Sequence, residues 1–141
     1  MFFGEFDYKV DEKGRVPIPP KFRSELLDGV VLTAGIEKCI LAYPLAEWTK
    51  LADSLTTGPI TRSKLRRLNR AIFAAAFSLN IDGQGRLALP PQLREYAEIK
   101  DEAVVAGVNK YFELWNKPRW AEEKTMSREQ AWQIMESLEE L

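Results

Sequence analysis

The stretch "DEKGRVPIPPKFR" at residues 11–23 returns almost unchanged as "DGQGRLALPPQLR" at residues 82–94, and this repetition decides the fold. In both copies an aspartate stands three residues before a glycine and four before an arginine, and the arginine leads into an apolar alternation that ends in Pro-Pro. The offset of 71 residues is about half of the 141-residue chain. Units too small to bury their own apolar face usually pack against each other, so we expect the two copies to share one core.

Each repeated loop lies between segments in which apolar and polar residues alternate. Residues 5–10 before the first loop and 77–82 before the second show the period of two that predicts half-buried strands. Each Pro-Pro predicts the first turn of a short helix, because that turn needs no N–H donors. "VVLTAG" at 30–35 matches "AVVAG" at 103–107 with an offset of 72, and a further apolar run after each predicts a hairpin. We therefore expect an α+β fold with a mostly β core, in which two β-loop-β-helix repeats form an intrachain pseudo-twofold pair with flanking helices.

The same pattern divides the chain into four parts. We expect the first repeat with its following helix at 1–60, a basic linker helix at 61–75, the second repeat at 76–120 and an acidic C-terminal helix at 121–141. Residues 121–141 hold six Glu against one Lys and one Arg, and since the whole chain carries −1, residues 1–120 carry +3. A mildly basic body is compatible with a polyanionic partner.

Composition excludes several classes of function. The chain has no histidine and one cysteine, so the commonest general base and the Cys/His zinc sites are missing, and we expect no enzyme, cofactor or metal. No apolar run approaches the roughly 20 residues of a membrane span, and the N-terminus does not resemble a signal peptide. We therefore expect a cytoplasmic protein with no membrane and no small-molecule substrate among its partners.

The geometry of the repeated loop predicts where its side chains point. In the first copy, Asp11 is expected to accept backbone N–H groups of the turn, and Gly14 to supply a positive φ angle. Because Val16 and the residues after it alternate inward and outward, Arg15 is expected to point outward and to be exposed. The equivalent residues of the second copy are Asp82, Gly85 and Arg86.

Three interpretations of this loop remain open on these grounds. The aspartate and arginine could form a local ion pair that only holds the turn. A phosphate-binding glycine loop is disfavoured, because a strand follows the loop and not a helix N-terminus. Nucleic-acid contact is favoured by the doubling, since arginine suits both phosphate and guanine, and Lys9 and Lys13 lie close to Arg15 in the first copy. Gln84 replaces Lys13 in the second copy, where it could read an adenine edge.

The pattern D-x-x-G-R, followed by an apolar alternation, a proline and a short helix, resembles the AbrB-type DNA-binding element. Two such copies in a chain that opens with "MFFGEFDYKVDEKGRVPIPPKFR" resemble the MraZ family of bacterial transcriptional regulators over residues 1–120. The resemblance implies two AbrB-like domains and ring-shaped homo-oligomers at the nucleoid. It also implies binding to direct repeats in double-stranded DNA upstream of the division and cell-wall gene cluster, usually as a repressor. The motif aspartates and arginines fall on Asp11, Arg15, Asp82 and Arg86.

A second hypothesis treats the chain as a protein-interaction module that also binds DNA to regulate its own synthesis. AbrB-like elements occur in antitoxins, where an appended tail captures a toxin. The segment "SREQAWQIMESLEEL" at residues 127–141 could act as such a tail, with Ala131, Ile134, Met135 and Leu138 as an apolar stripe. The favoured alternative is that this stripe packs on its own subunit or on a neighbouring one.

Overall fold

Antiparallel strands carry the fold in the computed structural model, which describes residues 1–138. The strands are β1 (Glu5–Lys9), β2 (Arg15–Pro17), β3 (Val30–Ala34), β4 (Ile40–Pro44), β5 (Phe77–Leu79), β6 (Arg86–Ala88), β7 (Glu102–Gly107) and β8 (Phe112–Trp115). The helices are α1 (Pro20–Arg23), the 3-10 turn η1 (Ser24–Leu26), α2 (Leu45–Thr57), α3 (Arg62–Ile72), α4 (Pro91–Ala97) and α5 (Lys117–Glu136). The expected α+β class with a mostly β core is confirmed.

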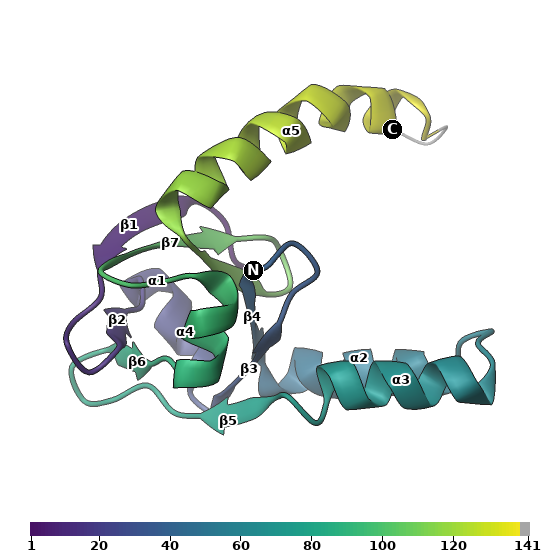
Figure 1. Ribbon diagram of the computed structural model, residues 1–141, viewed down its shortest axis with the longest axis horizontal. Helices are drawn as coiled ribbons and strands as arrows, with labels where there is room; N and C mark the ends of the chain where they lie inside the picture. The colour runs from purple at the N-terminus through teal and green to yellow at the C-terminus, as the bar shows by residue number, and fades with distance from the viewer. Residues whose placement is uncertain (139–141) are drawn as a thin grey trace.

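The two halves of the chain exchange strands with each other. One sheet runs in the order β1-β7-β8-β4-β3-β5, and β2 pairs with β6 in a second, two-stranded sheet. The first strand of each half therefore pairs with the hairpin of the other half, β1 with β7 and β5 with β3 (Figure 1). At the centre of the sheet β4 pairs with β8. This arrangement is the predicted intrachain pseudo-twofold pair, and neither half could complete its sheet alone.

Strand pairing corrects one detail of the repeat. Tyr8 lies opposite Ala103 in β7, and its counterpart Leu79 lies opposite Val30 in β3. Equivalent residues of β3 and β7 are thus separated by 73 positions and not by the expected 72. The offset grows from 71 to 73 because the second half has two more residues between its Pro-Pro pair and this strand. The hairpin loop that follows has five residues at 35–39 in the first half and four at 108–111 in the second, and it returns the offset to 72 at β4 and β8.

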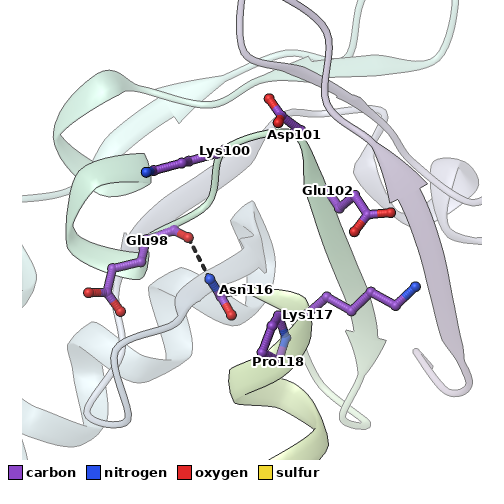
Figure 2. A pocket seen from close by; sticks show the side chains of 7 residues that line it. All are labelled: Glu98, Lys100, Asp101, Glu102, Asn116, Lys117 and Pro118. Carbon is purple, nitrogen blue, oxygen red and sulfur yellow. Dashed lines mark hydrogen bonds between the residues drawn. The ribbon is translucent and has the colours of Figure 1, made fainter.

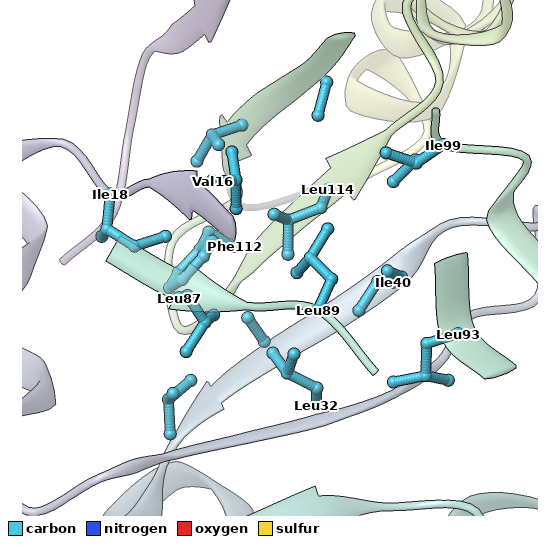
Figure 3. Packing of buried hydrophobic residues seen from close by; sticks show 14 of the residues in the cluster. Val16, Ile18, Leu32, Ile40, Leu87, Leu89, Leu93, Ile99, Phe112 and Leu114 are labelled. Carbon is cyan, nitrogen blue, oxygen red and sulfur yellow. The ribbon is translucent and has the colours of Figure 1, made fainter. Parts of the chain in front are cut away.

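The core lies between the large sheet and the layer formed by β2, β6, α1 and α4. Residues of the loop strands face residues of the central sheet strands across this core (Figure 3): Val16, Ile18, Leu87 and Leu89 on one side, and Leu32, Ile40, Phe112 and Leu114 on the other. All of these side chains are buried, so the predicted inward alternation after each loop is confirmed. Both Pro-Pro pairs start helices as predicted, with Pro20 and Pro91 in the first turns of α1 and α4.

Three helices lie outside this core. α2 and α3 form a helical hairpin, and α5 leaves the sheet as a separate arm (Figure 1). The C-terminal helix begins at Lys117, before the expected residue 121, because the Asn116 side chain caps it by accepting from the N–H of Arg119 at 3.0 Å. It ends at Glu136, and residues 139–141 of the expected helix lie outside the described residues. Within the described part of the chain, no helix has the length and apolar character needed to cross a membrane.

Candidate nucleic-acid interface

The first D-x-x-G-R loop is organised by one carboxylate. Oδ1 of Asp11 accepts from the backbone N–H groups of Lys13 and Arg15, both at 2.9 Å. Oδ2 of Asp11 accepts from Nε of Arg15 at 2.7 Å. Gly14 takes the turn through a φ angle of 77°, in the left-handed region that favours glycine. The expected roles of Asp11 and Gly14 in shaping the loop follow directly from these contacts.

The second loop repeats this geometry. Oδ1 of Asp82 accepts from the N–H groups of Gln84 and Arg86 at 2.9 Å, and Oδ2 accepts from Nε of Arg86 at 3.0 Å. The φ angle of Gly85 is also 77°. Two different sequences, Glu-Lys and Gly-Gln between aspartate and glycine, therefore adopt one backbone shape, and the aspartates and glycines of the two loops make the same contacts.

The halves hold each other's loops in place. The N–H of Ile18 donates to the carbonyl of Gly85 at 2.9 Å, and the N–H of Leu89 donates to the carbonyl of Gly14 at 2.9 Å. The guanidinium of Arg86 also lies 3.8 Å from Oδ2 of Asp11. The two arginine loops are therefore neighbours that are joined directly by contacts between the two halves of the chain.

The motif arginines are less exposed than the sequence predicts. The side chain of Arg15 is 31% exposed and that of Arg86 is 25% exposed, so the prediction that both are exposed was wrong. The cause is the bond from each Nε to its aspartate, which draws the side chain along the loop. Within residues 1–138, the terminal Nη groups of Arg15 donate no hydrogen bond, so they are available to an acceptor outside the chain.

Hydrogen bonding also fixes the charge state of the aspartates. The backbone N–H of Arg15 and then its side chain lower the pKa of Asp11 below its ordinary value. The backbone N–H of Arg86 does the same for Asp82. Both carboxylates are therefore ionised at neutral pH and hold their arginines through charge-assisted bonds.

Sequence reasoning missed two arginines that brace the loops from the opposite half. Arg94 packs over Gly14, where an added Cβ would lie 2.7 Å from its Nη1. Arg23 packs over Gly85 in the same way and donates from Nε to the carbonyl of Ile18 at 3.0 Å. The 71-residue spacing of Arg23 and Arg94 was the signal that could have identified them, since it equals the offset of the loops.

The two loops differ in their charged surroundings. Lys13 is exposed beside the first loop, but Glu12 next to it offsets its charge, and the second loop carries the neutral pair Gly83 and Gln84. The larger difference comes from the flanks, where Lys9 and Lys21 of the first half are replaced by neutral residues, Asn80 and Gln92. Lys21 holds its Nζ 4.4 Å from the ring centre of Phe3. The first half thus presents the stronger positive field.

A surface depression lies away from these loops, between the end of α4 and the start of α5 (Figure 2). Both carboxylates and ammonium groups line it, and the Asn116 side chain donates across it to the carbonyl of Glu98 at 2.7 Å. Arg119 pairs with the Glu98 carboxylate at 3.0 Å. Among residues 1–138, no group of three metal-ligating side chains is placed to hold an ion. The depression therefore has the polar contacts of a helix start and not those of a built ligand site.

A duplicated β scaffold that presents paired D-x-x-G-R loops defines a tandem-repeat protein built from two β-loop-β-helix units. The family model described as "MraZ protein, putative antitoxin-like" matches residues 1–71 and again residues 72–137. The chain belongs to the MraZ family, a family of transcriptional regulators and not of enzymes.

Individual relatives agree with this assignment. A protein of Dehalococcoides mccartyi named "Transcriptional regulator MraZ" is 60% identical over 141 residues, which cover 99% of each chain. A protein of the same name from Herpetosiphon aurantiacus is 48% identical over 120 residues, or 85% of this chain and 84% of the relative. Another from Halothermothrix orenii is 42% identical over 141 residues, covering 100% of this chain and 99% of the relative.

Proposed function

We propose that this chain is a sequence-specific, double-stranded-DNA-binding transcriptional regulator that acts through its two D-x-x-G-R loops. The observation that carries the proposal is the pair of arginines, each held by an aspartate at Nε, with the terminal nitrogens taking no part in that bond. An arginine fixed in this way loses little conformational entropy when it binds a phosphate or the O6/N7 edge of guanine.

The residues of the interface have different roles in this proposal. Arg15 and Arg86 contact bases, Lys9 and Lys13 contact phosphates, and Gln84 contacts a base edge. Asp11, Gly14, Asp82 and Gly85 shape the loops. The four-part division of the chain at 1–60, 61–75, 76–120 and 121–141 belongs to the same proposal, with both loop repeats at the DNA.

The proposed targets are short direct repeats upstream of the division and cell-wall gene cluster, where binding represses transcription. A single pair of loops makes few phosphate contacts, so tight binding needs several subunits. We propose that the chain forms a ring-like homo-oligomer, which sets the loops of successive subunits at regular intervals. The protein would then act in the cytoplasm, at the nucleoid.

Binding to repeats at different spacings tests this proposal. Two direct repeats about one helical turn apart, roughly 10 bp, should bind much more tightly than one repeat, and a half-turn insertion at constant sequence should remove the gain. Affinity should also fall steeply with salt, because several subunits release counterions together. Equal affinity for one repeat and for two at any spacing would contradict binding by an oligomer.

A second candidate function is an antitoxin-like interaction module that also binds DNA to regulate itself. The exposed side chains of α5 favour it, since Trp132 is 65% and Ile134 58% exposed. Purification from the native cell separates the two functions. Recovery of DNA with this chain as the sole polypeptide supports the regulator, and recovery of a second polypeptide at a fixed ratio supports the module.

A further inference from the structure

Helix α5 is fastened to the body at its start. The ring of Trp120 packs 5.7 Å from that of Trp115, and its Nε1 donates to Glu5 at 2.7 Å. Nζ of Lys124 pairs with the same carboxylate at 2.8 Å. After Lys124, no side chain of the described part of α5 forms a hydrogen bond or ion pair with another element.

The free part of α5 carries an apolar stripe that no other part of residues 1–138 covers. Its members on the helix are Ala131, Ile134 and Met135, and Leu138 follows just after the helix ends at Glu136. Ile134, Met135 and Leu138 are 58%, 46% and 53% exposed. A helix of this kind gains most of its stability by burying such a stripe against a partner.

The two helices of the α2–α3 hairpin do not bury their apolar side chains fully. Neither α2 nor α3 has a fully buried residue, and their leucines, such as Leu55 and Leu68, are only half-buried. Two helices cannot enclose an apolar core between them, whereas a third helix in their groove can.

The pseudo-twofold relation shows which helix is missing. α2 follows the central strand β4 and α5 follows its counterpart β8, and Trp48 and Trp120 occupy equivalent places at their starts. α2 has α3 as its partner, but the chain supplies no equivalent of α3 to α5 within residues 1–138.

Charge indicates where α5 docks. α3 carries five basic residues and no acidic one: Arg62, Lys64, Arg66, Arg67 and Arg70. The chain after Arg128 carries Glu129, Glu136 and two further glutamates, with no basic residue. An acidic helix end therefore complements a basic helix, and like-charged pairs of α3 helices or of α5 ends are disfavoured.

The two elements cannot meet within one chain as it is built. α5 and the α2–α3 hairpin leave the body as separate arms (Figure 1). Each arm is fixed at its root, α5 through Trp120 and the hairpin through Thr33, whose Oγ1 donates to the carbonyl of Ile72 at 2.8 Å. We propose that the apolar stripe of α5 docks on the α2–α3 hairpin of a second copy of this chain, with the glutamate-rich end of α5 along α3.

This contact joins two different surfaces. Each time a further chain is added, one α2–α3 hairpin at one end of the assembly and one α5 at the other end therefore remain without a partner. Such a heterologous contact continues until a ring closes or a filament forms. Pairing of α5 with α5 would instead stop at a dimer. The inference rests on the self-association in the proposed function and names the elements that carry it.

Charge reversal tests the contact through molar mass in solution, without DNA. The variants Glu129→Lys/Glu136→Lys and Arg66→Glu/Arg67→Glu should each raise the dissociation concentration by about tenfold or more, and one chain with all four changes should recover most of it. Glu122→Lys, on the fastened part of α5, is the control and should leave the mass unchanged. Circular dichroism verifies folding of each variant. The proposal would be overturned if the charge reversal at Arg66 and Arg67 did not change the molar mass. It would also be overturned if the variant with all four changes did not recover self-association.

Disulfide trapping gives an independent result. In a Cys39→Ser background, chains with Ile134→Cys are mixed with tagged chains that carry Arg67→Cys. The proposal expects mixed disulfides between the two kinds of chain, and disulfides only between Ile134→Cys chains would overturn it in favour of α5 pairing. Binding of a DNA repeat is measured on the same samples. Intact assembly without DNA binding contradicts the proposed regulator, whereas DNA binding by an oligomer insensitive to charge reversal contradicts only the docking of α5.

Discussion

Replacement of Gly85 by alanine tests whether glycine is needed to build the second loop. At a φ angle of 77° an alanine pays roughly 1–2 kcal/mol for the left-handed conformation. The new Cβ would also lie 2.6 Å from Nη1 of Arg23, so the guanidinium must move. That movement breaks the 3.0 Å bond to the carbonyl of Ile18, at a cost of about 1–1.5 kcal/mol. Alanine recovers about 0.4–1 kcal/mol by restricting the unfolded chain. We expect a net loss of about 2 kcal/mol in the free energy of unfolding.

Gly83, two positions earlier in the same loop, provides the matched control. An added Cβ at Gly83 meets nothing within 4 Å, and its φ angle lies outside the left-handed region. Gly83→Ala should therefore change the free energy of unfolding by less than about 0.5 kcal/mol or stabilise slightly. Urea unfolding followed by fluorescence of the four tryptophans measures both variants. Equal midpoints for the two variants would refute the reasoning from loop geometry.

Further predictions concern the charged side chains of the loops. Arg15→Ala should weaken DNA binding by about 1–3 kcal/mol per engaged subunit in a binding assay, with unchanged thermal unfolding, and Arg86→Ala should be similar or milder. Lys13→Gln should lower the salt slope of binding by about one and Gln84→Lys should raise it by about one, and equal slopes would exclude phosphate contact at this position. Asp11→Ala should weaken DNA binding although it removes negative charge, because Arg15 loses its support; a gain in affinity would contradict this. Folding lowers the pKa of Asp11 from its unfolded value of 3.8. The ionised Asp11 therefore contributes its full stabilisation of the folded protein above pH 3.8, and this contribution is lost as the pH falls through the lower folded pKa. The protection of the Arg15 amide, measured by NMR as its exchange rate relative to the intrinsic rate at each pH, should accordingly fall only as the pH drops through the folded pKa of Asp11.

Local patterns in the sequence predicted the elements of this fold well. The period of two identified Val16 and Leu87 as core residues, and the Pro-Pro pairs marked the starts of α1 and α4. These features depend on the chemistry of residues that are close in the sequence, and the repeat shows each of them in two places. The shape of the D-x-x-G-R loop was predictable for the same reason, since the bonds that Asp11 accepts come from residues within four positions of it.

Features that depend on contact between the halves were not predictable. The 73-residue relation of β3 to β7 depends on two extra residues between the Pro-Pro pair and the strand in the second half, which a comparison of apolar runs alone does not locate. The bracing of Gly85 by Arg23 is a contact between the two halves of the chain. The partial burial of Arg15 follows from its bond to Asp11, whereas alternation along a strand gives only the side on which a residue lies.

A local ion pair and a DNA contact are competing interpretations of the loop on the sequence alone, but the structure allows one arginine to make both. Arg15 uses Nε for Asp11 and keeps its two Nη groups for another acceptor, so one guanidinium can hold the turn and contact DNA at once. The second half adds a link between the loops, because Arg86 bonds Asp82 and also lies 3.8 Å from Asp11. A carboxylate placed between two arginines reduces their mutual repulsion and keeps their spacing constant. Constant spacing of two guanidinium groups is what a pair of neighbouring acceptors on DNA requires, and the duplicated fold provides it from a single chain.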